Sequence, residues 1–225
     1  MKTVLITGGN RGIGKETARQ CKNKGNFVII AGRNPSQLND TASEIHADHI
    51  LVIDVSSIDS ISKAAAVFEK TKLSLDAIVN NAAILLKNDI SITSGNNGIL
   101  SETLTTNVLG PALVINAFLP FLKSGGQVIN VSSGGGSMSD DVGGWSPAYC
   151  ISKSALNALT RHQAYELQSE NIRVNAVCPG WTRTDMGGSA APRHVSQGAE
   201  TIVWLINEEH KFTGKFFRDK NIIPW

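Results

Sequence analysis

The sequence predicts a single doubly wound α/β domain, in which helices cover both faces of a parallel sheet. Six short apolar runs, rich in Val and Ile, alternate with longer segments of helical character. Runs that are apolar on both faces are typical of buried parallel strands, and their alternation with helices indicates crossovers on both sides of one sheet. No linker-like stretch or block of charge divides the 225 residues, so we expect one domain over 1–225.

Each expected strand is an apolar run bounded by glycine, asparagine or aspartate, which favour turns. The first run leads directly into a glycine-rich turn, and the third ends at Asp54, which with Ser56 or Ser57 can cap the next helix. In chain order, the expected strands are TVLIT (3–7), FVIIA (27–31), HILVID (49–54), LDAIVNN (75–81), GQVINVS (126–132) and IRVNAVCP (172–179). The expected helices cover 12–24, 35–46, 57–72, 98–122, 149–169 and 195–207.

The composition argues against several classes of protein. The chain has 21 Lys and Arg against 19 Asp and Glu, a net charge of +2, and no run of like charges, so neither nucleic acid nor a membrane is an expected partner. Cys21, Cys150 and Cys178 are far apart, and the five histidines lack metal-ligand spacing, so we expect no disulfide framework and no metal site. The apolar run at the amino terminus is too short for a signal peptide or a membrane span, and a reducing cytoplasm is the expected location.

A glycine-rich turn, TGGNRGIG over 7–14, lies between the first expected strand and the first expected helix. Glycines at positions 8, 12 and 14 allow a tight turn and close approach of the backbone to a phosphate, while the helix amino terminus offers unpaired N–H groups. This context favours a dinucleotide site of the Rossmann type over a tight turn that binds nothing.

The position after the second strand indicates which dinucleotide is bound. A site that prefers NAD usually carries an acidic residue there, whereas this chain has Arg33, with Arg11 in the glycine-rich turn. The two arginines predict a clamp for the 2′-phosphate of NADP(H); the alternative is that Arg33 is only solvated. Asp54, at the end of the third strand, can accept a hydrogen bond from adenine or cap the next helix.

Tyr149 and Lys153 are four residues apart in AYCISK, at the start of an expected helix. This spacing places both side chains on one helix face, where the ammonium favours phenolate and lowers the pKa of the tyrosine. Tyr149 is then a proton donor or acceptor usable near neutral pH. The alternative is an ordinary exposed pair of side chains.

Taken together, these motifs resemble the short-chain dehydrogenase/reductase family, in order and across nearly the whole chain. The glycine-rich turn is followed by NNAA (80–83), NVSS (130–133), YCISK (149–153) and PGWTRT (179–184). The segments CPGWTRTDM and GAETIVWL also resemble the carbonyl reductase branch of that family.

The resemblance implies a catalytic set of four residues. Tyr149 would protonate the carbonyl oxygen, and Ser133 would donate a hydrogen bond to it. Lys153 would lower the tyrosine pKa and hold the nicotinamide ribose, and Asn107 would position a water beside the lysine. Such donors, fixed before the reaction, stabilise the developing alkoxide.

The resemblance also implies the cofactor contacts. Thr184 would contact the carboxamide, and Pro179 and Gly180 would shape the nicotinamide pocket. The full set of expected NADP(H)-binding residues is Gly8, Asn10, Arg11, Gly12, Ile13, Gly14, Arg33, Asp54, Val55, Asn81, Ala82, Tyr149, Lys153, Pro179, Gly180, Thr182 and Thr184.

The chain departs from the family pattern at two places. Ala83 stands where the family most often has glycine. The interval from Ser133 to Tyr149 is a few residues longer than usual, so Ser132 stays an alternative to Ser133, and the longer loop is expected at the substrate entrance. Trp145 and Trp181 flank this region and either line the pocket or pack there.

The predicted function is NADPH-dependent, reversible reduction of a small ketone, aldehyde or quinone, carried out by a monomer or a homo-oligomer (dimer or tetramer). The alternative is a catalytically silent NADP-binding sensor or scaffold protein. The presence of Asn107, Ser133, Tyr149 and Lys153 disfavours that alternative.

Overall fold

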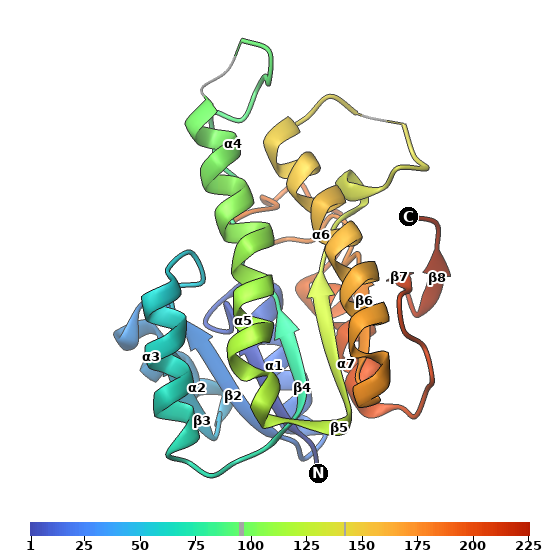
Figure 1. Ribbon diagram of the computed structural model, residues 1–225. Coiled ribbons are helices and arrows are strands. Elements are labelled where there is room, and N and C mark those ends of the chain that lie inside the picture. The colour runs from blue at the N-terminus through green and yellow to red at the C-terminus, as the bar shows by residue number, and fades with distance from the viewer. Residues whose placement is uncertain (95–96, 142) are drawn as a thin grey trace.

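The computed structural model describes residues 1–94, 97–141 and 143–225, and its frame is one eight-stranded sheet (Figure 1). The strand order is β3-β2-β1-β4-β5-β6-β7-β8, and all neighbours are parallel except β7 and β8. The strands are β1 (Thr3–Thr7), β2 (Phe27–Gly32), β3 (His49–Val52), β4 (Leu75–Asn80), β5 (Leu122–Val131), β6 (Arg173–Val177), β7 (Phe216–Arg218) and β8 (Asn221–Ile223).

Helices cover both faces of the sheet, as the strand–helix alternation predicts (Figure 1). On one face Phe68 of α3 (Ile58–Glu69), Phe118 of α5 (Gly110–Phe118) and Ala164 of α6 (Pro147–Glu166) belong to one buried cluster. On the other face α1 (Gly12–Asn23), α2 (Pro35–Ile45) and α7 (Val195–Asn207) contribute to a second cluster, through Cys21, Leu38 and Ile202 among others. The doubly wound fold is therefore confirmed.

The carboxyl edge of the sheet differs from the prediction, because β7 and β8 form an antiparallel hairpin that the sequence analysis missed. Asp219 and Lys220 make its two-residue turn with φ values of 52° and 62°. Positive φ at both central positions is typical of a type I′ turn, which Asn-Gly or Asp-Gly usually provides. Because Asp-Lys lacks that signal, the sequence analysis did not predict these two strands at the edge of the parallel sheet.

The expected helix over 98–122 is a run of four pieces: α4 (Asn97–Leu104), a π-helical turn η1 (Thr105–Leu109), α5 and a short 3₁₀ turn η2 (Leu119–Phe121). Within the described residues, the stretch Gly98–Phe121 is long and apolar enough to cross a membrane by length and composition alone. Here it lies along the sheet, with Val114, Ile115 and Phe118 in the core.

The strand order reverses at the middle of the sheet, between β1 and β4. The chain leaves β1 toward β2 and β3, then returns to pair β4 on the other side of β1. Loops that follow β1 and β4 therefore diverge, and ligands of open α/β sheets bind in the crevice beyond such a reversal.

Candidate active site

A cleft of about 800 Å³ lies at the carboxyl ends of the central strands. It brings together most of the predicted cofactor residues, from loops far apart in the sequence. Those that line it are Gly8, Asn10, Arg11, Gly12, Ile13, Arg33, Asp54, Val55, Asn81, Ala82, Tyr149, Lys153, Pro179 and Thr184. Gly14, Gly180, Thr182, Ser133 and Asn107 are not in its lining.

The glycine-rich turn forms a cradle that side chains would fill. Gly8 and Gly12 have φ values of 63° and 52°, the left-handed region that favours glycine. A Cβ on Gly14 would lie 2.3 Å from the carbonyl oxygen of Gly8 and 2.4 Å from Nδ2 of Asn81. Asn81 donates from Nδ2 to the carbonyl oxygens of Thr7 (3.0 Å) and Gly8 (3.1 Å), which fixes the turn.

Helix α1 begins directly after this turn, and no side chain caps its amino terminus. Its first N–H groups therefore remain available beside the cleft, where an anion would be favoured by the helix dipole. The cradle and the uncapped helix together fit a pyrophosphate.

One end of the cleft carries the two predicted arginines. Arg33 is exposed, and the Arg11 guanidinium forms an ion pair with Asp185 at 3.2 Å. Both side chains of that pair are mostly exposed, 62% and 78%, so solvent screens the attraction and a phosphate can compete for the arginine.

Asp54 lies in the same part of the cleft. Its Oδ1 accepts hydrogen bonds from the Ser56 backbone N–H (3.0 Å) and hydroxyl (2.6 Å). Burial raises the pKa of Asp54, but the Ser56 hydrogen bonds and the Arg33 charge outweigh it, so the net shift is downward. Ser57, not Asp54, caps α3 by accepting from the Ser60 N–H, which leaves the carboxylate of Asp54 facing the cleft.

The other end of the cleft brings Tyr149, Lys153 and Ser133 together. Tyr149 and Lys153 lie on the first two turns of α6 and are 8% and 3% exposed. Nζ of Lys153 is 5.5 Å from the centroid of the Tyr149 ring and donates to the carbonyl oxygen of Val131 at 2.8 Å. Ser133 follows β5, its Oγ accepts the Gly135 N–H at 3.1 Å, and it lies close enough to the phenol to lower the pKa of Tyr149.

The pKa values of this pair differ from the expectation. Burial raises the pKa of Tyr149 to about 12, and the nearby Ser133 hydroxyl offsets only part of that rise. Burial also lowers the pKa of Lys153 to about 8. The predicted lowering of the tyrosine pKa is therefore wrong for the protein without cofactor, because desolvation of the phenolate is the largest influence on this pKa.

The two serines of NVSS have different partners. Ser132 is 2% exposed, and its hydroxyl donates to Oδ1 of Asn157 at 2.6 Å. Ser132 borders the cleft, but its hydroxyl is held by the core, whereas the Ser133 hydroxyl is next to the Tyr149 phenol. The geometry favours Ser133 in the choice that the sequence left open.

Asn107 lies in the π-helical turn and is fully buried. Its Oδ1 accepts from the Ile84 N–H (2.9 Å), and its Nδ2 donates to the Ile84 carbonyl (2.9 Å) and to Oγ of Ser152 (3.0 Å). The residue therefore joins the loop after β4 to α6, one residue before Lys153. A π-helical turn inside a helix is frequent at functional sites.

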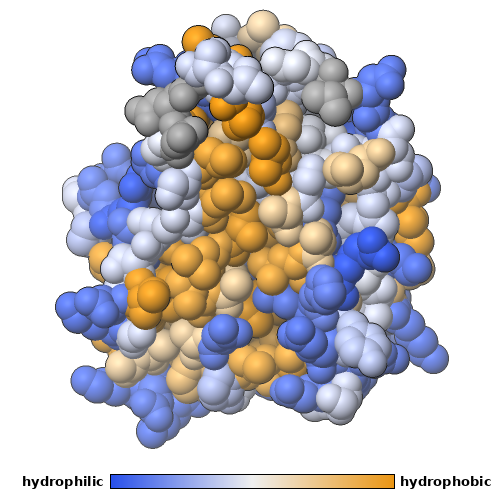
Figure 2. All heavy atoms as spheres, turned by 45° about the horizontal axis from the view of Figure 1, so that its top comes forward, coloured by the Kyte–Doolittle hydropathy of each residue, from blue (hydrophilic) through white to orange (hydrophobic). Residues whose placement is uncertain are grey.

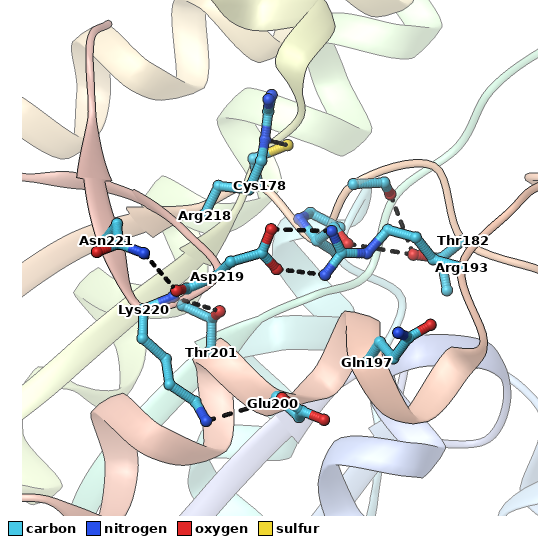
Figure 3. A network of polar contacts seen from close by, with 12 residues as sticks. Cys178, Thr182, Arg193, Gln197, Glu200, Thr201, Arg218, Asp219, Lys220 and Asn221 are labelled. Atoms are coloured by element: carbon cyan, nitrogen blue, oxygen red, sulfur yellow. Dashed lines mark hydrogen bonds and ion pairs between the residues drawn. The ribbon is translucent and has the colours of Figure 1, made fainter.

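The PGWTRT segment forms part of the cleft wall, to which it contributes Pro179 and Thr184. Gly180 has a φ of 73°, and a Cβ there would lie 2.5 Å from Cδ of Arg193. Arg193 in turn forms a two-point ion pair with Asp219 of the β7–β8 turn (Figure 3). The carboxyl-terminal hairpin thus holds this wall in place.

Thr182 and Thr184 point in different directions from that wall. Thr182 is buried and donates to the carbonyl oxygen of Gly180 at 3.0 Å, so its hydroxyl is turned inward. Thr184 lines the cleft, with its methyl group next to the position of a Cβ on Gly12. The structure therefore brings Thr184 to the cleft and keeps Thr182 behind it.

Several lining residues were not predicted, namely Lys15, Gln37, Asp40, Thr41, Glu44, Ile84, Thr106, Val131, Asp185 and Met186. Gln37 accepts from Asn10 (3.0 Å) and Lys15 pairs with Glu44 (2.5 Å), which ties α1 and α2 together beside Arg33. The contact between α1 and α2 is a tertiary contact that no local motif signals. At the opposite end, the Trp145 ring is 5.8 Å from Tyr149 and 47% exposed, as expected for an entrance.

Comparison with known proteins agrees with this geometry. The family model for short chain dehydrogenases matches residues 2–195. Short-chain dehydrogenase anuI of Penicillium roqueforti is 31% identical over 241 residues, covering 98% of this chain and 95% of that protein. The crystal structure of NADPH-bound carbonyl reductase from chicken fatty liver has a TM-score of 0.90 and 32% identity, covering 100% of this chain and 99% of that one. Carbonyl reductase Sniffer of D. melanogaster has a TM-score of 0.91 and 33% identity, with full coverage of both chains at 100%.

Proposed function

Because the chain belongs to the short-chain dehydrogenase family, we propose that it is an NADPH-dependent reductase of a small carbonyl compound. The observation that carries the proposal is the meeting of Tyr149, Ser133 and Lys153 at one end of a cleft whose other end is a glycine cradle. The similar carbonyl reductases support the choice of reaction. A ketone, aldehyde or quinone is reduced to the alcohol, and the reaction is reversible.

In the proposed mechanism, Tyr149 and Ser133 act on the carbonyl oxygen. When bound, NADPH supplies the hydride for the carbonyl carbon. Tyr149 donates its phenolic proton to the oxygen, so that hydride and proton together give the alcohol. The Ser133 hydroxyl donates a hydrogen bond to the same oxygen and stabilises the negative charge that develops there.

Lys153 and Asn107 complete the proposed catalytic set. The buried ammonium of Lys153 favours the phenolate left after proton transfer and donates a hydrogen bond to the nicotinamide ribose. Asn107 fixes the π-helical turn against α6 through Ser152, and we propose that it positions a water beside Lys153.

The remaining cleft residues would hold the cofactor. We propose that the glycine cradle with Asn10, Ile13 and the α1 amino terminus takes the pyrophosphate, and that Arg11 and Arg33 take the 2′-phosphate. Asp54 and Val55 would border the adenine, with Asn81 and Ala82 beside the ribose. Pro179, Gly180, Thr182 and Thr184 would form the nicotinamide wall, with Thr184 the residue whose side chain reaches the cleft.

The first test is turnover of a panel of ketones, aldehydes and quinones, followed by NADPH absorbance. We expect reduction of at least one class, and Tyr149→Phe should abolish it while NADPH affinity stays within about twofold, because the change removes the proton donor and little volume. Near-normal turnover by Tyr149→Phe would contradict the mechanism. NADPH binding by the unmodified protein, without turnover of any carbonyl, would favour a sensor or scaffold protein.

Cofactor choice is tested by repeating the assay with NADH. A hydrogen bond to a charged group contributes about 1.5–3 kcal/mol, which solvent exposure and salt reduce, so we expect kcat/KM to favour NADPH by about ten- to a thousandfold. Arg33→Asp should narrow or invert that preference, since the carboxylate repels the phosphate and accepts from a 2′-hydroxyl. Equal use of both cofactors would show that the arginines are only solvated.

We also propose that the protein forms homo-oligomers and works in the cytoplasm. Figure 2 shows an apolar band on one face of the molecule. Leu109 of η1 and Ile151 of α6 are 48% and 41% exposed. Such a band supports a symmetric contact between two copies.

The three cysteines are free thiols, which fits a reducing compartment such as the cytoplasm.

A further inference from the structure

The helix that carries Tyr149 begins without a cap of its own. Ser146 is its N-cap residue, but it has a left-handed backbone with φ 39° and its side chain makes no capping hydrogen bond. Pro147 follows at the first helical position and has no N–H to satisfy. The next two donors, the N–H groups of Ala148 and Tyr149, are those that an N-cap side chain normally satisfies.

Both donors are taken by one carboxylate from a distant loop. Asp89, in the loop after β4, accepts the Ala148 N–H at Oδ1 (2.9 Å) and the Tyr149 N–H at Oδ2 (2.8 Å). The Cys150 N–H then makes the first intrahelical hydrogen bond, to the Ser146 carbonyl oxygen at 3.0 Å. Every backbone donor of the first turn is thereby satisfied.

Asp89 is 5% exposed, and among the described residues it forms no ion pair with a lysine, arginine or histidine. A buried carboxylate is costly unless it is hydrogen-bonded, and here the two N–H groups and the positive end of the helix dipole stabilise it. Burial, and then the Asp89 charge, raise the pKa of the Cys150 thiol.

We propose that Asp89 is a positioning residue for the reaction, which holds Tyr149 in place by capping the catalytic helix from the loop after β4. This proposal rests on the assignment of Tyr149 as proton donor. The two hydrogen bonds fix the backbone of Tyr149 itself, so loss of Asp89 displaces the phenol relative to Ser133. Misplacement of a reacting group by about 1 Å can cost a factor of about 10² in rate.

The loop geometry explains why the cap comes from elsewhere in the chain. The segment between Ser133 and Tyr149 is longer than the family usually has, and it enters α6 through the left-handed Ser146. That backbone turns the Ser146 side chain away from the first-turn N–H groups, whereas a capping residue is normally extended. Asp89 therefore couples the loop after β4 to the point where the loop after β5 enters α6.

The test compares Asp89→Asn and Asp89→Ala with a matched control, Asp76→Asn. Asp76 also accepts a backbone N–H, from Thr3 at 2.7 Å, and pairs with Lys123, but it lies at the other end of β4. We expect kcat to fall about tenfold in Asp89→Asn, because the amide keeps one oxygen that can accept a backbone N–H. In Asp89→Ala, kcat should fall about a hundredfold, because both acceptors are lost. NADPH affinity should change less than twofold in either variant. Asp76→Asn should lower thermal stability and leave kcat unchanged.

A second measurement does not depend on turnover. Residue-resolved amide exchange on the unmodified protein should show protection at Ala148 and Tyr149, although first-turn amides have no intrahelical acceptor. Protection at both should be lost in Asp89→Ala. Unprotected amides in the unmodified protein, unchanged kcat in Asp89→Ala, or equal kcat losses in Asp89→Asn and Asp76→Asn would overturn the proposal. Absent turnover in the unmodified protein would instead count against the proposed function.

Discussion

Ser132 and Ser133 are neighbours in one motif, yet the fold gives their hydroxyls different environments. Because Ser133 lies beside the Tyr149 phenol, Ser133→Ala should lower kcat/KM by about 10² to 10³, the usual cost of one oxyanion donor. Ser132→Ala leaves Oδ1 of the buried Asn157 without its donor, so it should lower the free energy of unfolding by about 1–3 kcal/mol. Steady-state kinetics and thermal unfolding of both variants separate the two roles, and the reverse pattern would assign the oxyanion contact to Ser132.

Lys153 makes stability depend on pH in the alkaline range. Its pKa is about 8 in the folded chain against an ordinary value of 10.5, so between these values the unfolded chain binds more protons, and stability increases as pH rises. The increase from Lys153 should reach about 2 kcal/mol between pH 8 and about pH 9.5. Above about pH 10, Tyr149 should lower the stability as pH rises. Its pKa is raised to about 12 in the folded chain, so the unfolded chain loses the phenolic proton first.

Lys153→Met isolates this contribution, since it removes the titrating group and keeps an apolar stem of similar length. Denaturant unfolding of both proteins at several pH values between about 7.5 and 9.5 gives the difference in free energy of unfolding. A constant difference over that range would show that the lysine is not desolvated. The motif could predict that Tyr149 and Lys153 are neighbours, but the depth of burial that sets both pKa values depends on the loops that cover α6.

The turn between β1 and α1 is an element that tolerates no added side chain at Gly14. A Cβ there would overlap the Gly8 carbonyl oxygen at 2.3 Å, so Gly14→Ala should destabilise the protein by about 1–3 kcal/mol and weaken NADPH binding, because the cradle must open. Gly25→Ala is the matched control: Gly25 also has a positive φ, 76°, but no atom lies within 4 Å of its added Cβ. Calorimetry and a fluorescence titration with NADPH should show lower stability in both variants and weaker binding in Gly14→Ala alone.

The sequence predicted an element well where a single apolar run or a single motif determines it, as in β1 to β6 and in the glycine-rich turn. The prediction failed where a contact with a distant part of the chain determines the local conformation. The 98–122 helix was expected to be regular, whereas Asn107 draws a π-helical turn toward Ile84 and Ser152. Asp89 was not singled out, because a cap that comes from 59 residues away leaves no local signature.

At the scale of the whole molecule, the apolar band predicts self-association. We expect a dimer in solution, and Leu109→Glu with Ile151→Glu should convert it to a monomer, since burying two charges in an apolar contact is costly. Sedimentation analysis measures the change. Val67→Glu, at a residue that is 51% exposed on α3, is the control and should leave the assembly unchanged. If the unmodified protein is a monomer, the apolar band is not a contact between two copies of the chain.

The central position of β1 also has a consequence for synthesis on the ribosome. Val4 pairs with Val28 on one side and Ala77 on the other, so β1 keeps an open edge until β4 has emerged and folded back past β2 and β3. An unpaired strand edge with an apolar centre, here Val4 to Ile6, is a template for intermolecular pairing. Nascent chains stalled before residue 75 should therefore need chaperone protection, whereas chains that extend beyond β4 should not.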